Sequence, residues 1–498
     1  MRLLFITYEF PPKGGVGVQR PLATARYLAE AGWDVTVLTV ADPPTSLRDD
    51  ALLSGLPEAV RVERAWSLEP TRVVQGLRRV RSRLGSGPTG TFVRRLRNGL
   101  TSVPVGPEPS RAAEGRGAAS APVSRGYTSL SPRAIRLVQA LFVPDEKYWW
   151  TPFAVRLGKR LHREAAFDCI LASGPPFTAL GVARRLSRSC GIPWVADLRD
   201  PITDGCFFRP LTPLHRSLMY AFERRTLRSA SRVITVTEGM REAIGRRLPD
   251  VFGKVTTITN GFDPSVFAGP APAPRADFEL AYVGTFQRPI TPDVFLAAFA
   301  EARTRNPAFA ARARIAFIGA RDAATDEAVA ASGLADAVER TGFVPHGQAI
   351  ERMRAASVLL LLLGSGPENR LNLSGKLPEY LGTGRPVLAL IPPDGVAADV
   401  IRRSGAGWVL APDDVEGATA ALLESFAEWQ TGTLPEPDPD VVASFERSRL
   451  VAQTRELLAA AVAESGARSD ASARPGSGAK SGPDAASGSS AKSESSTR

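Results

Sequence analysis

The sequence predicts an α/β protein built from two doubly wound domains that face a central cleft. The chain has 498 residues, more than one hydrophobic core usually holds. Short apolar segments typical of buried strands alternate with helical patterns on both sides of a proline-rich linker, GPAPAPRAD, at residues 269–277. The first strand, a glycine-rich loop, a helix and the second strand form a βαβ unit, which implies a parallel sheet.

The first block, residues 1–265, begins with LLFIT at residues 3–7, a segment typical of a strand buried on both faces. A helix is expected over residues 18–31, and Gly32 suits the position just after its end. Further strands are predicted at residues 35–40, 169–172, 194–197, 232–237 and 255–259.

The second block, residues 278–435, repeats the alternation and predicts a second Rossmann-like domain. Its strands are expected at residues 278–283, 315–319, 358–363 and 387–390, and its helices at residues 292–302, 376–381 and 414–430. Such folds bind ligands beyond the carboxyl ends of their strands, so we expect the site in the cleft between the two domains.

Three segments lie outside these two cores. Residues 84–132 are rich in Pro, Gly, Ser and Arg, which predicts a disordered or loosely helical insertion. Residues 466–498 contain no Val, Ile, Leu or aromatic residue, which predicts a disordered tail. Between the second block and this tail, residues 436–465 are expected to form a helix that crosses back to the first domain.

Cysteine and histidine counts limit the classes of site. Three unevenly spaced cysteines and three histidines argue against a disulfide framework and a metal centre, and they predict a reducing compartment. The N-terminal apolar run is one strand long and ends at a Glu and two prolines, unlike a signal peptide. No apolar run approaches the roughly 20 residues of a membrane span. We therefore expect a cytoplasmic protein.

The net charge of +11 allows two interpretations. It can reflect a composition biased toward arginine, or it can attract a phosphorylated ligand, an anionic lipid or a nucleic acid. Basic clusters in the first half favour peripheral binding to the inner face of the plasma membrane; they lie at residues 78–83, 94–97, 156–163 and 184–188. They are not interleaved with aromatic residues, so nucleic acid is not an expected partner.

The loop FPPKGGVGVQRP follows the first strand. Gly14, Gly15 and Gly17 let the backbone approach a ligand, and the next helix begins there with free N–H groups. This suits a phosphate or a sugar hydroxyl, and Arg20 could point at an anion. The spacing is not GxGxxG, which disfavours a dinucleotide site. The alternatives are a simple tight turn and an ordinary surface arginine.

Two further strand ends of the first block carry polar side chains. In WVADLRDP, Asp197 is expected to brace the turn, and Asp200 to reach a ligand as a general base or as an acceptor for a sugar hydroxyl. SGPPF, residues 173–177, follows the preceding strand and could line the same cleft. The alternative is a solvated loop with an Asp–Arg pair.

Two strand ends of the second block carry further candidates. In YVGTFQRP, Gly284 and Thr285 allow a close approach and Arg288 supplies a cation; the alternative is an ordinary strand-to-helix turn.

The second of these strand ends is SGKLPEYLGTGRP. Ser374 is expected to cap a helix that Gly375 precedes. Lys376 lies in the first turn of that helix, where the dipole disfavours a cation unless an anion binds there. Glu379 lies on the same face and suits a ribose diol. Together they predict a nucleoside diphosphate pocket, with a surface salt bridge as the alternative.

These motifs together resemble the family 4 glycosyltransferases of the GT-B architecture. Seven segments occur in the order of that family, namely FPPKGGVGVQR, SGPP, ADLRDP, RVITVTEGM, ITNGFDPSVF, YVGTFQR and SGKLPEYLGTGRPVLAL. The resemblance covers nearly the whole chain outside the insertion and the tail. It implies transfer of a sugar from a nucleotide donor, usually with retention of configuration, and no metal requirement.

The resemblance also assigns residues. Glu379 matches the second glutamate of the Glu-x7-Glu motif, which holds the donor ribose in the family. The first glutamate would fall at Leu371, which cannot bind a sugar hydroxyl, so the chain departs from the pattern there. Glu368 or Asn369, or backbone N–H groups near Ser374, are the candidate substitutes.

The expected activity is therefore sugar transfer from a UDP- or GDP-sugar to a cell-envelope glycan or a lipid-linked acceptor. The acceptor would dock near residues 14–17 and Asp200, while Arg288 and Lys376 would stabilise the departing diphosphate. Two alternatives stay open. One is a sugar-nucleotide 2-epimerase of the same architecture, which the scarcity of histidine disfavours. The other is a non-catalytic anion-binding scaffold.

Overall fold

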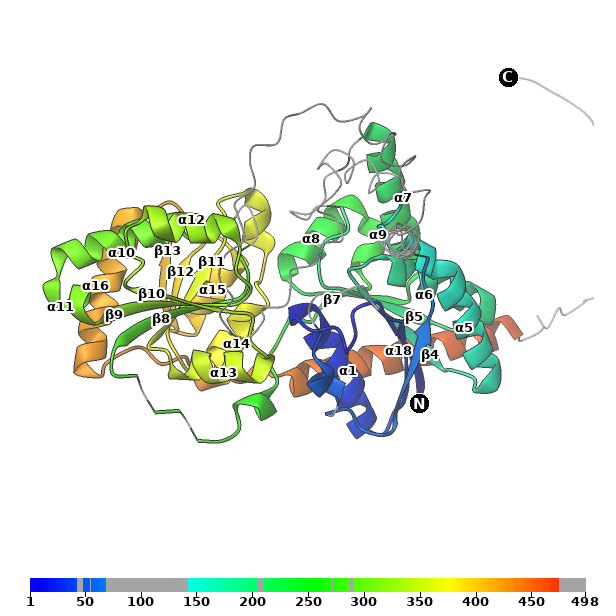
Figure 1. Ribbon diagram of the computed structural model, residues 1–498. Coiled ribbons are helices and arrows are strands. Elements are labelled where there is room, and N and C mark those ends of the chain that lie inside the picture. The colour runs from blue at the N-terminus through cyan, green and yellow to red at the C-terminus, as the bar shows by residue number, and fades with distance from the viewer. Residues whose placement is uncertain are drawn as a thin grey trace, which may run out of the picture.

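The computed structural model describes residues 1–42, 48–53, 55–68, 142–203, 210, 212–270, 272–273, 275–286 and 290–473. Within these residues the chain forms two parallel sheets, one of seven strands and one of six, each with helices on both faces (Figure 1). The predicted fold class, two Rossmann-like doubly wound domains, is confirmed. The predicted insertion at residues 84–132 lies outside the described residues.

The N-terminal sheet has the strand order β3-β2-β1-β4-β5-β6-β7 in the described residues, and every pairing is parallel. Its strands are β1 (Arg2–Thr7), β2 (Asp34–Val40), β3 (Val60–Ala65), β4 (Cys169–Gly174), β5 (Trp194–Leu198), β6 (Arg232–Thr235) and β7 (Val255–Thr257). The helices are α1 (Gln19–Glu30), α5 (Thr151–Glu164), α6 (Thr178–Cys190), α7 (Pro213–Ser229), α8 (Glu238–Arg247) and α9 (Pro249–Phe252), with short 3-10 turns η1 (Val16–Val18), η2 (Asp50–Leu53), η3 (Tyr148–Trp150) and η4 (Pro264–Phe267).

Apolar residues of this sheet are buried on both faces, as the continuous run in β1 predicts. Leu3 and Phe5 pack with Leu28 of α1 on one face, and Leu4 and Ile6 belong to the core on the other face, where α5, α6 and α7 pack. Alternating side chains of a strand point to opposite faces, so a run without polar interruptions needs a cover on each side.

The C-terminal sheet has the order β10-β9-β8-β11-β12-β13 in the part of the chain that the structure describes, again with parallel pairings. Its strands are β8 (Phe278–Val283), β9 (Ala313–Ile318), β10 (Val338–Gly342), β11 (Val358–Leu362), β12 (Val387–Leu390) and β13 (Gly407–Leu410). Its helices are α10 (Asp293–Arg305), α11 (Pro307–Arg312), α12 (Ala323–Ala331), α13 (His346–Ala355), α14 (Lys376–Gly382), α15 (Val396–Arg403) and α16 (Val415–Thr431), with the 3-10 turn η5 (Pro367–Leu371). The core on one face holds α10, α11 and α16, and that on the other holds α13, α14 and α15.

Sequence periodicity did not predict β3, β10 and β13. Each lies at an edge of its sheet, and each is only partly buried, with charged residues in VRVERA and VERTG. Edge strands have one unpaired side and often carry charges, so they lack the apolar run that marked the central strands.

The C-terminal segment returns to the first domain. After α17 (Pro439–Ala443), α18 (Arg447–Ala473) extends across the N-terminal domain and packs against α1 (Figure 1). The backbone joins the start of α18 to the last residues of the N-terminal domain, because Phe262 N donates to Phe445 O at 3.0 Å and Arg447 N donates to Phe262 O at 2.8 Å. Within the described residues, no helix has the length and apolar character needed to cross a membrane.

The prediction of a disordered tail from residue 466 is wrong for its first part. The helix α18 begins at Arg447 and continues to Ala473, beyond the apolar residues that hold it on the sheet. Extending an existing helix needs only one backbone hydrogen bond for each residue ordered, and Ala and Arg favour that extension. Residues 474–498 lie outside the described residues.

Candidate functional site

The loops that follow β1, β4 and β5 meet at one edge of the N-terminal sheet, because these strands are neighbours and parallel. The guanidinium of Arg199 joins them by donating to the carbonyls of Gly17 and Pro175. A Cβ on Gly17 would lie 3.6 Å from Arg199 Nη1, so this loop approaches the arginine closely. Gly14 is buried, and Gly15 has a φ of 99°, which favours glycine.

Asp197 braces this edge of the sheet, as predicted. Its carboxylate accepts hydrogen bonds from Arg20 Nη2 at 2.8 Å and Nε at 3.2 Å, and from Ser173 Oγ at 2.7 Å. Arg20 also donates to the carbonyls of Ile258 and Thr259. The interpretation that Arg20 points at a bound anion is therefore wrong, because its donors face the protein.

Asp200 lies beside this brace but has a different environment. Burial raises the pKa of its carboxyl to about 6, although the positive charge of Arg199 opposes the shift. It accepts no hydrogen bond from the residues that the structure describes. A carboxyl group with these properties is mostly ionised at pH 7, and no described residue donates a hydrogen bond to its two oxygens.

Arg199 is the residue that sequence reasoning undervalued here. Its position between Asp197 and Asp200 was interpreted only as half of a possible solvated ion pair, whereas it holds the two neighbouring loops in place. Burial lowers its pKa, and the carboxylates of Asp197, Glu9 and Asp200 counter that effect.

In the C-terminal domain, Gly284 and Lys376 lie against each other. A Cβ on Gly284 would approach Lys376 Cε to 2.7 Å, and Gly284 has a φ of 126°. Lys376 Nζ donates to Tyr282 Oη at 2.6 Å and lies 3.8 Å from the centroid of the Tyr282 ring. In the described residues no carboxylate pairs with this ammonium, and burial lowers its pKa to about 7.

Glu379 lies one turn further along α14 and is largely buried, with 12% of its side chain exposed. Its Oε1 lies 3.1 Å from Nε2 of His346, which begins α13. The buried guanidinium of Arg447, at the start of α18, is close enough for its charge to interact with Glu379. Sequence reasoning missed both partners, since neither lies in a motif near Glu379.

The predicted cap of α14 by Ser374 forms only as a long hydrogen bond. Ser374 Oγ accepts from Lys376 N at 3.4 Å, and the Ser374 carbonyl accepts from Leu377 N at 3.0 Å. Gly375 directly precedes the first residue of α14 and has helical backbone angles, and it supplies no side-chain cap itself.

The sequence also predicted two donor residues in the loop after β8. Thr285 is exposed, and Arg288 lies outside the described residues.

Leu371 lies at the contact between the two domains. Its Cδ2 would come within 2.4 Å of a Cβ placed on Gly239 in α8, and its carbonyl accepts a hydrogen bond from Thr237 Oγ1 at 3.1 Å. The leucine therefore packs against the N-terminal domain at the position where the resemblance calls for a sugar-binding glutamate. Asn369, one candidate substitute, is buried, and the side chain of Glu368 lies outside the described residues.

Two protein-family models match this chain. Residues 14–261 match a model described as a glycosyl transferase 4-like domain, and residues 277–428 match the glycosyl transferases group 1 model. The chain is a family 4-like glycosyltransferase. No curated protein matches its sequence significantly.

Solved structures share the GT-B fold of this glycosyltransferase. A glycosyltransferase from Rickettsia africae has a TM-score of 0.55 and 11% identity, covering 93% of this chain and 98% of its own. A UDP-forming α,α-trehalose-phosphate synthase from Burkholderia xenovorans has a TM-score of 0.54 and 15% identity, covering 92% and 98%. A sucrose-phosphate synthase from Thermosynechococcus elongatus has a TM-score of 0.53 and 16% identity, covering 94% and 98%.

Proposed function

We propose that this glycosyltransferase takes its sugar from a UDP- or GDP-sugar and transfers it, with retention, to a cell-envelope glycan or a lipid-linked acceptor. The observation that carries the donor assignment is the environment of Lys376. It is an ammonium in the first turn of a helix, beside a glycine with positive φ, and it pairs with no carboxylate in the described residues.

A diphosphate supplies what Lys376 lacks. Burial disfavours the charged ammonium, so the site gains most from a ligand that brings negative charge to it. The leaving nucleoside diphosphate gains charge as the glycosidic bond breaks, and a positioned cation stabilises that developing charge. Gly284 leaves the space in which Lys376 lies, and together with Gly375 it lets the backbone approach the phosphates.

Glu379 is proposed to bind the donor ribose. One of its oxygens contacts His346, which limits the rotation of the carboxylate, and the second is left for a hydroxyl. In the acceptor half, Asp200 is proposed to accept the proton of the attacking hydroxyl or a hydrogen bond from it. Gly14, Gly15 and Gly17 are proposed to line the acceptor path.

Two further properties belong to this proposal. Because Lys376 and the start of α14 supply the positive charge, no metal is required, and activity should persist in EDTA.

The basic N-terminal domain is proposed to hold the enzyme peripherally on the anionic inner face of the plasma membrane, where a lipid-linked acceptor would lie. Co-sedimentation with anionic vesicles at low salt, and its loss at high salt, tests this second property.

Thermal-shift titration with UDP-, GDP- and ADP-sugars tests the donor site. We expect one nucleotide class to stabilise the wild type, and Lys376→Ala and Glu379→Ala to lose most of that stabilisation. Arg402→Ala, an exposed residue of the same domain, is the control and should respond like the wild type. No stabilisation by any nucleotide sugar, or full stabilisation of both site variants, would contradict the proposal.

Gly284→Ala tests the shape of the same pocket. The methyl group would displace Lys376, and the positive φ adds a backbone strain of roughly 1–2 kcal/mol. We expect a folded variant with weakened nucleotide binding.

Conversion of a nucleotide sugar to its epimer by the wild type, without any acceptor, would instead support the 2-epimerase alternative.

A further inference from the structure

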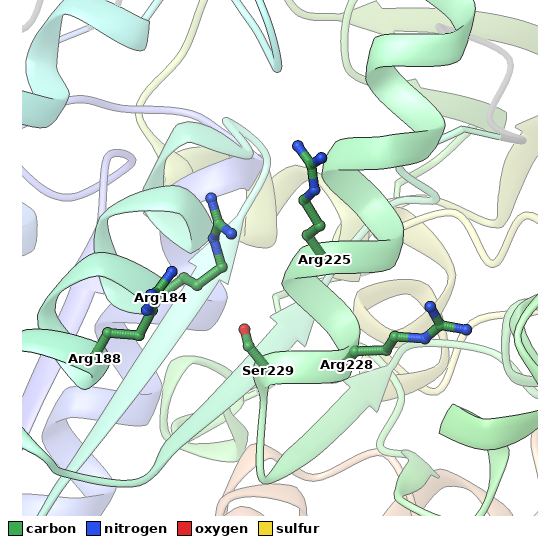
Figure 2. A pocket seen from close by; sticks show the side chains of 5 residues that line it. All are labelled: Arg184, Arg188, Arg225, Arg228 and Ser229. Carbon is green, nitrogen blue, oxygen red and sulfur yellow. The ribbon is translucent and has the colours of Figure 1, made fainter.

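Four arginines surround an open pocket between α6 and α7, in the N-terminal domain. Its volume is about 630 Å³, and it is lined by Arg184, Arg188, Arg225, Arg228 and Ser229. Figure 2 shows Arg184 and Arg188 reaching from α6 and Arg225 reaching from α7 into the space between the helices, whereas Arg228 points away from it. The basic cluster at residues 184–188 therefore has a counterpart on the neighbouring helix.

This pocket lies at the opposite edge of the sheet from the glycosyl transfer site. Trp194, the first residue of β5, donates from Nε1 to Ser229 O at 2.9 Å and accepts at its carbonyl from Ser231 N at 2.9 Å. Asp200 and the glycine loop follow the carboxyl ends of their strands instead. The arginine pocket is thus separate from both halves of the proposed catalytic cleft.

Three of the four arginines lack a counter-ion in the part of the chain that the structure describes. Arg228 pairs with Asp250 at 2.7 Å, but Arg184, Arg188 and Arg225 form no ion pair with a described carboxylate. Arg184 Nε is buried without a hydrogen-bond partner. Burial lowers the pKa of Arg184, and the positive charges of Arg185, Arg188 and Arg225 lower it further.

Helix capping does not account for this cluster. Cations are favourable in the last turn of a helix, which explains Arg188 in α6 and Arg228 in α7. The carboxyl end of α7 already has Lys254, whose Nζ donates to the carbonyls of Arg228 and Ala230. Arg184 is one turn earlier, and like charges at positions i and i+4 destabilise a helix. An arrangement that costs stability in the free protein indicates a ligand of opposite charge.

We propose that this pocket binds a phosphate or diphosphate group of a second ligand. Guanidinium groups bind phosphate oxygens through two parallel hydrogen bonds, and Arg184 and Arg225 approach the space from opposite sides (Figure 2). Ser229 lines the same space, but its hydroxyl already donates to Thr226 O at 2.8 Å, so the arginines supply the donors. The phosphate can belong to an anionic lipid headgroup or to a soluble phosphorylated compound, and both present the same chemistry to the arginines.

Calorimetric titration with sodium pyrophosphate tests the site. The titrations use Lys376→Ala as the parent, so that the proposed donor pocket does not contribute. We expect the parent to bind pyrophosphate, and addition of Arg184→Gln/Arg225→Gln to weaken binding at least about tenfold, since two charge-assisted contacts are lost. The matched control adds Arg156→Gln/Arg246→Gln, two exposed arginines of the same domain that do not line the pocket, and should bind like the parent.

Thermal melting shows whether the variants are folded. Removal of two like charges should leave the melting temperature of Arg184→Gln/Arg225→Gln equal to that of the parent or about 2 °C higher at low salt. Absence of pyrophosphate binding by the folded parent, or equal binding by both multiple variants, overturns the proposal. Neither result bears on the donor site, which the nucleotide titrations test separately.

Vesicle co-sedimentation distinguishes the two sources of phosphate. The wild type and Arg184→Gln/Arg225→Gln are compared on phosphatidylglycerol and on phosphatidylcholine vesicles. Selective loss of binding to phosphatidylglycerol by the variant identifies a lipid headgroup as the ligand. Unchanged vesicle binding together with weakened pyrophosphate binding identifies a soluble phosphorylated ligand.

Discussion

The two halves of the proposed glycosyl transfer site use their positive charges differently. In the N-terminal half, Arg20 and Arg199 donate to Asp197 and to backbone carbonyls, so these cations hold loops together. In the C-terminal half, Lys376 donates only to the neutral hydroxyl of Tyr282 among the described residues. The first half is thus internally neutralised and leaves the carboxyl of Asp200 for a ligand. The second half leaves a cation.

This difference suits the two partners of a glycosyl transfer. An acceptor hydroxyl loses a proton as it attacks, which a nearby carboxylate assists, and a leaving diphosphate gains negative charge, which a nearby cation stabilises. The carboxyl of Asp200 therefore suits the acceptor side, and the ammonium of Lys376 suits the donor side. The contrast between Arg20 and Lys376 can therefore be tested by substitution.

Breaking the internal neutralisation should have the largest effect. Arg20→Met leaves the buried Asp197 carboxylate without its cation and two backbone carbonyls without a donor. We expect the free energy of unfolding of the N-terminal domain to fall by about 3–5 kcal/mol, measured by urea denaturation. The double variant Arg20→Met/Asp197→Leu should lose less than the sum of the single variants. A loss below about 1 kcal/mol for Arg20→Met would show that this ion pair does not brace the sheet.

The alternation of apolar segments and helices was sufficient to predict the fold. Central strands such as β1 and β11 are buried on both faces, so their residues form continuous apolar runs. Edge strands such as β3 and β10 are only partly buried, and no such run marks them. The extent of α18 beyond residue 465 depends on helix propagation, which composition alone does not indicate.

The sequence predicted the location of a candidate site residue only where that residue follows the end of a predicted strand. Lys376 and Gly284 were both assigned to strand ends of the second domain, and the structure places them in contact because β8 and β11 are adjacent. The partners of single side chains were not predictable, since His346 reaches Glu379 from another helix. Such contacts depend on how helices pack over the sheet, and a motif read along the chain does not record that packing.

Asp200→Asn should have the next largest effect, and it should act on catalysis alone. The amide cannot accept a proton, so we expect kcat to fall by about 10²-fold while nucleotide affinity stays unchanged. In the wild type, kcat/KM should fall as the pH drops through about 6, because burial raises the pKa of Asp200 to that value and the ionised form is required. Steady-state kinetics from pH 5 to 8 provide the measurement. An unchanged kcat for Asp200→Asn would remove Asp200 from the mechanism.

Lys376 should make nucleotide binding dependent on pH in the opposite direction. Its pKa is lowered to about 7 in the free protein, so the ammonium loses its proton as the pH rises above 7. A bound diphosphate favours the charged form, so binding at pH 8 should take up a proton, and affinity should fall up to about tenfold per pH unit. Calorimetry in two buffers with different ionisation enthalpies measures this uptake. Lys376→Met should bind weakly at every pH and take up none.

Leu371→Glu is expected to have the smallest effect, although it restores the glutamate of the family pattern. The side chain at this position packs on Gly239 in the first turn of α8, in the N-terminal domain. Loss of apolar packing is partly offset because the helix dipole favours a carboxylate there, so we expect a net destabilisation of about 1 kcal/mol or less. Affinity for the nucleotide sugar should change by less than about threefold relative to Leu371→Gln, since one hydrogen bond to a sugar hydroxyl would change it more. A tenfold gain for the nucleotide sugar, with none for the free nucleotide, would instead show that residue 371 reaches the donor sugar.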